Sequence, residues 1–165
     1  MNFQNYIEHV KNRLLRSYDL EENKVLGGRE MNLFGAYHLR TERYIATKKA
    51  VVYGMENHEY ICLFHLTALT EDGLTDYINW IKQNIDDLVN PHREHMSTMV
   101  SLVLVCDVQP SEEVLRKVRR VKFHKGYSFG FKGWVDLKLL VYSLEDQSLI
   151  TNRKGEEGSE AFQIS

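Results

Sequence analysis

The sequence predicts a single α+β domain, in which helices cover a mixed, largely antiparallel sheet of five to seven strands. Three observations support this fold class. Segments with apolar residues at helical spacing alternate with segments of strand-like pattern. The chain of 165 residues has the length of one domain, and its 43% of hydrophobic and 27% of charged residues suit a packed core. The expected order is α-β-β-β-α-β-α-β-β, with the domain over residues 1–152 and a polar, mobile tail over residues 153–165.

The N-terminal segment is expected to form a helix from Asn2 to Asp19. Its apolar residues recur at steps of three and four, which places them on one face: Phe3, Ile7, Val10, Leu14 and Tyr18. The Gly27–Gly28 pair then predicts a turn. Residues 31–40 follow it with the alternation of a strand, whereas a phosphate-binding glycine loop leads into a helix.

Two more strands are expected at residues 43–53 and 58–67, joined by a turn at residues 54–57. The second of them is apolar on both faces, so it should lie inside the sheet. The clearest helix should begin after Thr70, whose hydroxyl suits a helix cap, and end before Asn90–Pro91.

The second half of the chain begins with an apolar, β-branched run over residues 99–108, which predicts an interior strand. Pro110 should then open a short helix that buries Val114, Leu115 and Val118. From Val121 to Val141 most odd-numbered positions are apolar and keep one strand phase through several glycines, which predicts one long bent strand or two strands of common phase. Residues 149–152 should form a short closing strand.

Composition limits the classes of partner. A net charge of -2 and a pI near 6.4 argue against bulk attraction to nucleic acid or to an anionic membrane. No secretory signal and no apolar run of roughly 20 residues is visible, so we expect a soluble, cytoplasmic protein with no membrane partner. The two cysteines, Cys62 and Cys106, lie in apolar runs and should be buried free thiols.

The most suggestive local feature is a basic segment over residues 116–125, in which six lysines and arginines gather in a near-neutral chain. Aromatic residues follow it. If the segment after Val121 forms one long strand, its even-numbered residues share one face. A solvated surface with balancing acids is the simpler interpretation. The functional hypothesis is a surface for an anionic partner, either nucleic acid or another protein, formed by Arg116, Arg119, Arg120, Lys122, His124, Lys132, Trp134 and Lys138.

The order of elements over roughly residues 2–120 resembles the core of the PD-(D/E)XK endonucleases. The resemblance implies a metal held by an acid on the second core strand and by an acid-x-lysine triplet on the third. Here the third strand offers Glu59-Tyr60-Ile61, with isoleucine in place of the lysine. A second triplet, Asp136-Leu137-Lys138, stands on a later strand, where Asp107 could approach it. Alternation places Asp136 and Lys138 on the solvent face, as an exposed ion pair.

Other candidate residues carry weaker signals. His92 and His95 could bind a metal with Glu94 or a distant histidine, but a plain polar loop is the preferred interpretation. His65 is expected to be a hydrogen-bonded core histidine. We therefore expect a binding or assembly domain with no catalytic residue, metal or cofactor. A metal-dependent phosphodiesterase is the alternative, and the positions of Glu42, Glu59, Asp107 and Asp136 should discriminate between them.

Overall fold

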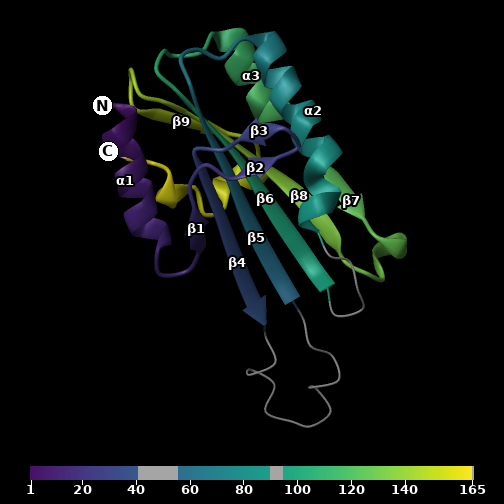
Figure 1. Cartoon of the computed structure of the whole chain (residues 1–165). Helices are drawn as coiled ribbons and strands as arrows, with labels where there is room; N and C mark the ends of the chain where they lie inside the picture. Colours follow the sequence, from purple (N-terminus) through teal and green to yellow (C-terminus); the bar gives the residue numbers. More distant parts are fainter. Residues whose placement is uncertain (41–55, 90–94, 165) are drawn as a thin grey trace.

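A seven-stranded sheet crosses the computed structural model, which describes residues 1–40, 56–89 and 95–164 (Figure 1). Across the sheet the strands run β1-β4-β5-β6-β8-β7, and β9 also pairs with β8. Their bounds are β1 (Asp19–Glu21), β4 (Leu33–Arg40), β5 (Glu56–Leu66), β6 (His95–Cys106), β7 (His124–Gly126), β8 (Trp134–Ser143) and β9 (Ser148–Thr151). Two short strands, β2 (Val25–Leu26) and β3 (Arg29–Glu30), form a separate ribbon.

The sheet is mixed, and its centre is parallel. β5 pairs parallel with β6 and β6 pairs parallel with β8, whereas the other four pairs of this sheet are antiparallel. The parallel strands need crossover connections, and these contain the helices α2 and α3. The predicted α+β class with a mixed, largely antiparallel sheet is therefore confirmed.

Three helices cover the described sheet. α2 (Glu71–Leu88) and α3 (Glu112–Arg120) lie over one face, and α1 (Phe3–Leu14) lies over the other (Figure 1). Thr70 and Ser111 cap the amino ends of α2 and α3 with their side-chain oxygens. No helix among the described residues is both long and apolar enough to cross a membrane.

The first helix is shorter than predicted. It ends at Leu14, and the amide of Tyr18 then donates to the Leu14 carbonyl in a turn that leads into β1. Tyr18 nevertheless packs against the α1 core, because the turn returns its side chain to the sheet. An apolar residue at helical spacing thus marked the correct face but not the helix end.

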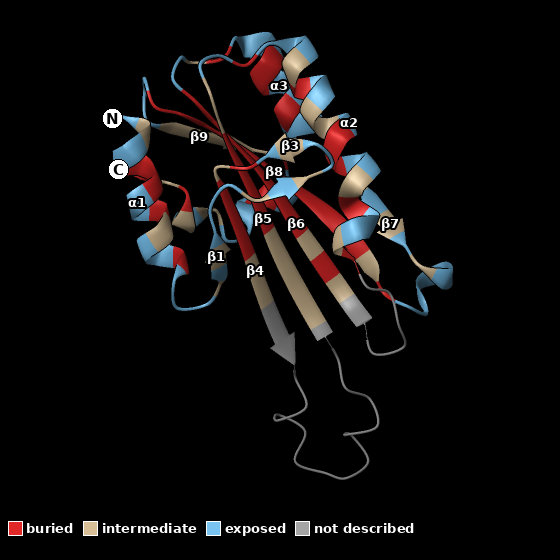
Figure 2. Ribbon diagram, in the orientation of Figure 1, coloured by how far each residue is buried: buried red, intermediate tan, exposed pale blue. Residues whose placement is uncertain are grey.

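Two cores lie on opposite faces of the sheet, and the inner parts of β5, β6 and β8 are buried (Figure 2). Under α2 and α3 the core contains Cys62 and Cys106, both free thiols, as predicted. Under α1 it contains Tyr6, Val10 and the residues of β5, β6 and β8 that face that helix. The parts of these strands that are covered on both sides are continuously apolar, at residues 61–64, 102–106 and 139–142.

The predicted mobile tail over residues 153–165 is wrong for the part that the structure describes. Residues 153–164 form two short turns, η4 (Lys154–Glu156) and η5 (Ser159–Ala161), and return to α1. Phe162 and Ile164 are buried in the α1 core, and the Tyr6 hydroxyl donates to the Phe162 carbonyl. The domain therefore extends well beyond Asn152, because two apolar side chains in a polar segment complete that core.

The apolar phase from Val121 to Val141 belongs to two strands, not one. β7 and β8 pair antiparallel, and a turn containing η3 (Ser128–Gly130) joins them. Ser128 and Phe129 adopt positive φ angles of 50° and 56° in this turn. The strand predicted for residues 43–53 lies outside the described residues, and β4 pairs directly with β5, with Arg40 opposite Glu56.

Candidate functional site: a polar sheet face with two clefts

The sheet face that α1 covers is apolar at one end and polar at the other. Its side chains form rows across β5, β6 and β8, because adjacent strands keep their register and alternate residues share a face. From the α1 core toward the amino ends of these strands, the rows are Leu63–Val103–Leu140, Ile61–Ser101–Lys138 and Glu59–Met99–Asp136. Charged groups thus enter the sheet where the apolar α1 core ends.

Asp136 and Lys138 are buried, so their predicted exposure as a surface ion pair is wrong. Only 5% of Asp136 and 8% of Lys138 is accessible to solvent. They face the side of β8 away from α2 and α3, as alternation predicts, but the C-terminal turns cover that side. They do not pair with each other: the Lys138 ammonium donates to the Glu157 carbonyl at 3.0 Å.

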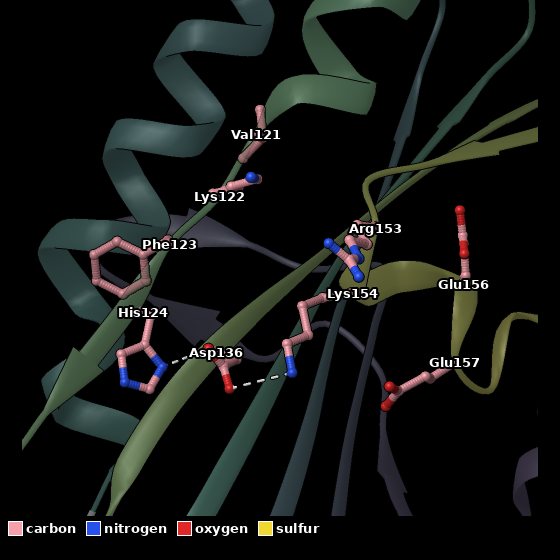
Figure 3. A pocket seen from close by; sticks show the side chains of 9 residues that line it. All are labelled: Val121, Lys122, Phe123, His124, Asp136, Arg153, Lys154, Glu156 and Glu157. Carbon is pink, nitrogen blue, oxygen red and sulfur yellow. Dashed lines mark hydrogen bonds and ion pairs between the residues drawn. The ribbon is translucent and has the colours of Figure 1, made fainter. Parts of the chain in front are cut away.

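A cleft of about 480 Å³ opens beside Asp136 (Figure 3). We call it the basic cleft. Three segments supply its walls: the residues between α3 and β7, one position of β8, and the η4 turn. Its lining residues are Val121, Lys122, Phe123, His124, Asp136, Arg153, Lys154, Glu156 and Glu157.

A buried carboxylate organises the floor of the basic cleft. β7 and β8 place His124 directly opposite Asp136, and His124 Nδ1 lies 2.7 Å from Asp136 Oδ1. The other carboxylate oxygen lies 3.8 Å from the Lys154 ammonium. Asp136 therefore holds the Nδ1 edge of the His124 imidazole and the ammonium group of Lys154. His124 Nε2 forms no hydrogen bond with any described residue, and it remains open to a ligand.

Asn152 holds the η4 turn against the sheet. Its buried side-chain oxygen accepts hydrogen bonds from the amides of Leu139 and Gly155, and its amide group donates to the carbonyls of Val121 and Leu137. A Cβ atom on Gly155 would lie 3.0 Å from Asn152 Oδ1, so this glycine lets the turn pack closely. The two residues together place Arg153 and Lys154 over β8.

The cations of the basic cleft face one another across it. Lys122 and Arg153 form no ion pair with another residue in the described ranges. Figure 3 shows Arg153 and Lys154 on the inner side of the η4 turn and Lys122 on the opposite segment, between α3 and β7; Glu156 and Glu157 also line the cleft, further along the turn. Phe123 forms an apolar wall beside them. Such an arrangement favours an anion with a flat apolar portion.

The structure brings together three of the eight binding residues that the sequence predicts. Lys122 and His124 line the basic cleft, and Arg119 lines an adjoining hollow of about 530 Å³ together with Arg153. The rest lie elsewhere. Arg116 and Arg120 are exposed on α3 and line neither hollow. Lys132 lies in the turn between β7 and β8, and Trp134 is half-buried at the start of β8. Lys138 faces a second cavity. His124, Trp134 and Lys138 share one face of the β7–β8 pair, but the turn between these strands interrupts the predicted continuous face and carries Lys132 away from it.

Arg153, Lys154 and Asn152 escaped the prediction. The sequence assigns Asn152 to the end of a strand and the two basic residues to a tail. Their only visible signal is a basic pair between an asparagine and a glycine, which is also typical of an ordinary turn.

The acids proposed for a metal site do not meet. Glu59 and Asp136 share a row, but Met99 lies between them, so their strands are about 10 Å apart. Asp107 lies at the other end of the sheet, where His65 Nε2 approaches its Oδ1 at 2.7 Å and Phe3 stacks on His65. His65 therefore has a hydrogen-bond partner, although it is not fully buried.

The remaining predicted metal ligands are not part of the described site. Glu42 and His92 lie outside the described residues, and the side chain of His95 is not described either. Within the residues that the structure does describe, no group of three histidine, cysteine or acidic side chains could hold a metal.

Comparison with known proteins identifies a family. Residues 2–164 match a family model whose description is "Domain of unknown function (DUF8052)". The match includes the C-terminal turns that form one wall of the basic cleft. No curated protein and no solved structure matches the chain.

Proposed function

The chain belongs to the DUF8052 family, whose description names no activity, and we propose that it is a binding domain that holds nucleic acid at the basic cleft. The observation that carries this proposal is the convergence of Lys122, Arg153 and Lys154 from two separate segments beside Phe123. Three carboxylates, Asp136, Glu156 and Glu157, also line the cleft, so the proposed anion site is confined to the part of the cleft nearest the three cations.

Phosphate is the anion that this group fits best. An arginine guanidinium can donate two parallel hydrogen bonds to a phosphate, and lysine ammonium groups add compact charge. Asp136 lies below them and already contacts His124 and Lys154, so a phosphate would complete the upper side of the same charge network. The adjoining hollow adds Arg119, which extends the site along the chain of a polyanion.

The turn between β7 and β8 offers rings for base stacking. Phe129 and Phe131 have relative exposures of 103% and 83%, values at which large apolar side chains are unusual. A nucleic acid that lies along β7 could place phosphates at the basic cleft and bases on these rings. Both kinds of contact ignore base identity, so binding should be sequence-tolerant.

The lining of the basic cleft favours binding over catalysis. It contains a histidine and carboxylates, but it contains no serine, threonine or cysteine that could act as a nucleophile. Its carboxylate nearest the histidine is buried and already has two partners. In this proposal, Asp136 serves to position His124 and Lys154.

Fluorescence anisotropy with a labelled single-stranded oligonucleotide of mixed sequence tests the proposal. We expect weak binding whose affinity falls linearly with salt on logarithmic axes, because each phosphate contact releases counterions. The double variant Lys122→Glu, Arg153→Glu should lose about tenfold or more in affinity and show a shallower salt slope.

Arg16→Glu is the matched control for the single variant Arg153→Glu, because each reverses one charge and Arg16 is exposed on the α1 side and lines no described cleft. Equal affinity of Arg153→Glu and this control would remove the basic cleft from the function. The absence of binding at low salt to both single-stranded and duplex probes would remove the nucleic-acid proposal itself.

A metal-dependent phosphodiesterase is the second candidate, supported by one observation. Asp136 and Lys138 are both buried on one face of β8, with the spacing of the acid-x-lysine triplet. Glu59 occupies the same row as Asp136, but a separation of about 10 Å between their strands is wide for one metal ion. Cleavage of the labelled oligonucleotide that requires Mg²⁺ or Mn²⁺ and disappears in Asp136→Asn would favour this candidate over simple binding.

A further inference from the structure

A second cavity, of about 400 Å³, lies between α1, the sheet and the η5 turn. We call it the Lys138 cavity. Its polar lining includes Arg13, Tyr18, Glu59, Ser101 and Lys138. Arg13 lies on α1, and its guanidinium group is engaged by the carbonyls of Glu160 and Gln163, to which it donates. The other four come from the α1–β1 connection, β5, β6 and β8, so the cavity crosses the three central strands of the sheet.

Lys138 carries a buried charge with only a neutral partner. Its ammonium group donates to the Glu157 carbonyl, and no carboxylate of the described chain lies within ion-pair distance of it. Burial of an ammonium group costs free energy unless hydrogen bonds and an opposite charge compensate it, and a bound anion could supply that charge here. Ser101 lies beside it in the same row of the sheet, and the Ser101 hydroxyl has no hydrogen bond with another described residue.

Glu59 presents the opposite charge on another wall. Its carboxylate accepts a hydrogen bond from the Tyr18 hydroxyl, and within the described chain it has no basic partner. Burial and this hydrogen bond raise the pKa of Tyr18, so the hydroxyl stays protonated and acts as a donor. The carboxylate of Glu59 is thereby held in place and retains acceptor capacity toward the cavity.

The two charges are too far apart to neutralise each other directly. Glu59 lies one row away from Lys138 and two strands across, a lateral separation of about 10 Å. Ser101 lies between them on β6. An anion alone would satisfy Lys138 but would add a second negative charge near Glu59, and a cation alone would do the reverse.

We propose that the Lys138 cavity binds a small zwitterion of the amino-acid type. The carboxylate of the ligand accepts hydrogen bonds from Lys138 Nζ and Ser101 Oγ, and its ammonium group donates to the Glu59 carboxylate. A cavity of about 400 Å³ accommodates such a molecule. This proposal does not depend on nucleic-acid binding, because the two clefts share only Glu157 in their linings.

Titration of the full chain with glycine, alanine and 4-aminobutyrate, followed by two-dimensional NMR of the backbone amides, tests this site. Acetate and methylammonium serve as half-ligands that carry one charge each. We expect at least one zwitterion to shift the amide signals of Ser101 and Lys138 with an affinity about tenfold higher than that of either half-ligand. Glu59→Gln and Ser101→Ala should each weaken binding, and Lys138→Met should abolish it.

Ser101→Ala keeps the bond between Lys138 and Glu157, so it tests the site even if Lys138→Met fails to fold. Lys117→Met, at an exposed position of α3 that lines neither cavity, is the control and should bind the zwitterion as the native chain does. Equal binding of acetate and the zwitterions, or an unchanged affinity in Glu59→Gln, would overturn the zwitterion assignment. If no probe shifts these signals, Lys138 serves only to hold the C-terminal turns, and the site does not exist.

Discussion

His124 and Asp136 stand directly opposite each other across the β7–β8 pair, and their side chains meet at 2.7 Å. The side chain of His124 is 62% exposed, whereas that of Asp136 is only 7% exposed. A buried acid therefore anchors an accessible imidazole at the edge of the basic cleft. Asp107 meets His65 at the same distance elsewhere in the molecule, but its side chain is 44% exposed.

This difference in burial makes the two acids a matched pair for mutation. Asp136→Asn should lower the free energy of unfolding by roughly 1–3 kcal/mol, because it removes the charge that His124 and Lys154 share in a buried setting. Asp107→Asn should cost clearly less, since solvent screens its partner. Urea unfolding of both variants at neutral pH measures the difference, and equal costs would contradict the role assigned to Asp136.

Asn152→Ala should destabilise the domain by about 3 kcal/mol, because it leaves several buried backbone groups without a partner. The η4 turn should then detach from β8, so the variant should also bind nucleic acid more weakly at temperatures where it remains folded. Asn12→Ala, at an exposed position of α1, is the control for thermal unfolding. A stability unchanged from the native chain would mean that Asn152 does not organise the cleft.

Arg119 and Arg116 should differ in their contributions to nucleic-acid binding. Both are exposed on α3, but only Arg119 lines the hollow that it shares with Arg153. Arg119→Glu should therefore weaken oligonucleotide binding several-fold, and Arg116→Glu should change it less. Anisotropy titrations at one low salt concentration compare them. If the two variants lose affinity equally, the whole of α3 attracts the polymer and the cleft has no special part.

The variant Phe129→Ala, Phe131→Ala should fold normally, because both rings are exposed and surface changes of this kind usually stay within about 0.5 kcal/mol. Its free energy of binding to single-stranded nucleic acid should become weaker by about 1–3 kcal/mol for each base that stacks there. Duplex binding should change little, since paired bases are not free to stack on the rings. A loss of affinity that is the same for both probes would argue against stacking.

The two buried thiols predict a loss of stability at alkaline pH. Burial raises the pKa of Cys62 and that of Cys106 from 9.0 to about 12. Above pH 9 the unfolded chain therefore releases thiol protons that the folded chain keeps, and the free energy of unfolding falls as the pH rises toward 12. The double variant Cys62→Ala, Cys106→Ala, measured by urea unfolding across this range, should show a smaller fall.

Thiol titration provides an independent check on the same residues. The native protein should react slowly with a thiol reagent at pH 8, and the unfolded protein should yield two thiols. Rapid reaction of either cysteine in the native state would contradict its burial.

The sequence by itself determined most of the described helices and strands. Helical spacing and capping residues predicted α2 and α3, and continuous apolar runs predicted β5 and β6 as interior strands. These signals are local, because a helix or strand that must bury one or both faces shows it in the spacing of its own apolar residues.

Tertiary structure decided what covers each face and which distant residues meet there. Alternation correctly placed Asp136 and Lys138 on the face of β8 away from α2 and α3, but it could not show that the C-terminal turns bury both. It also could not show that Arg153, in a polar segment, lines the same cleft as Lys122. Strand register, the β7–β8 turn and the hydrogen bonds of Asn152 create these contacts between residues far apart in the chain, and spacing within one segment carries no information about them.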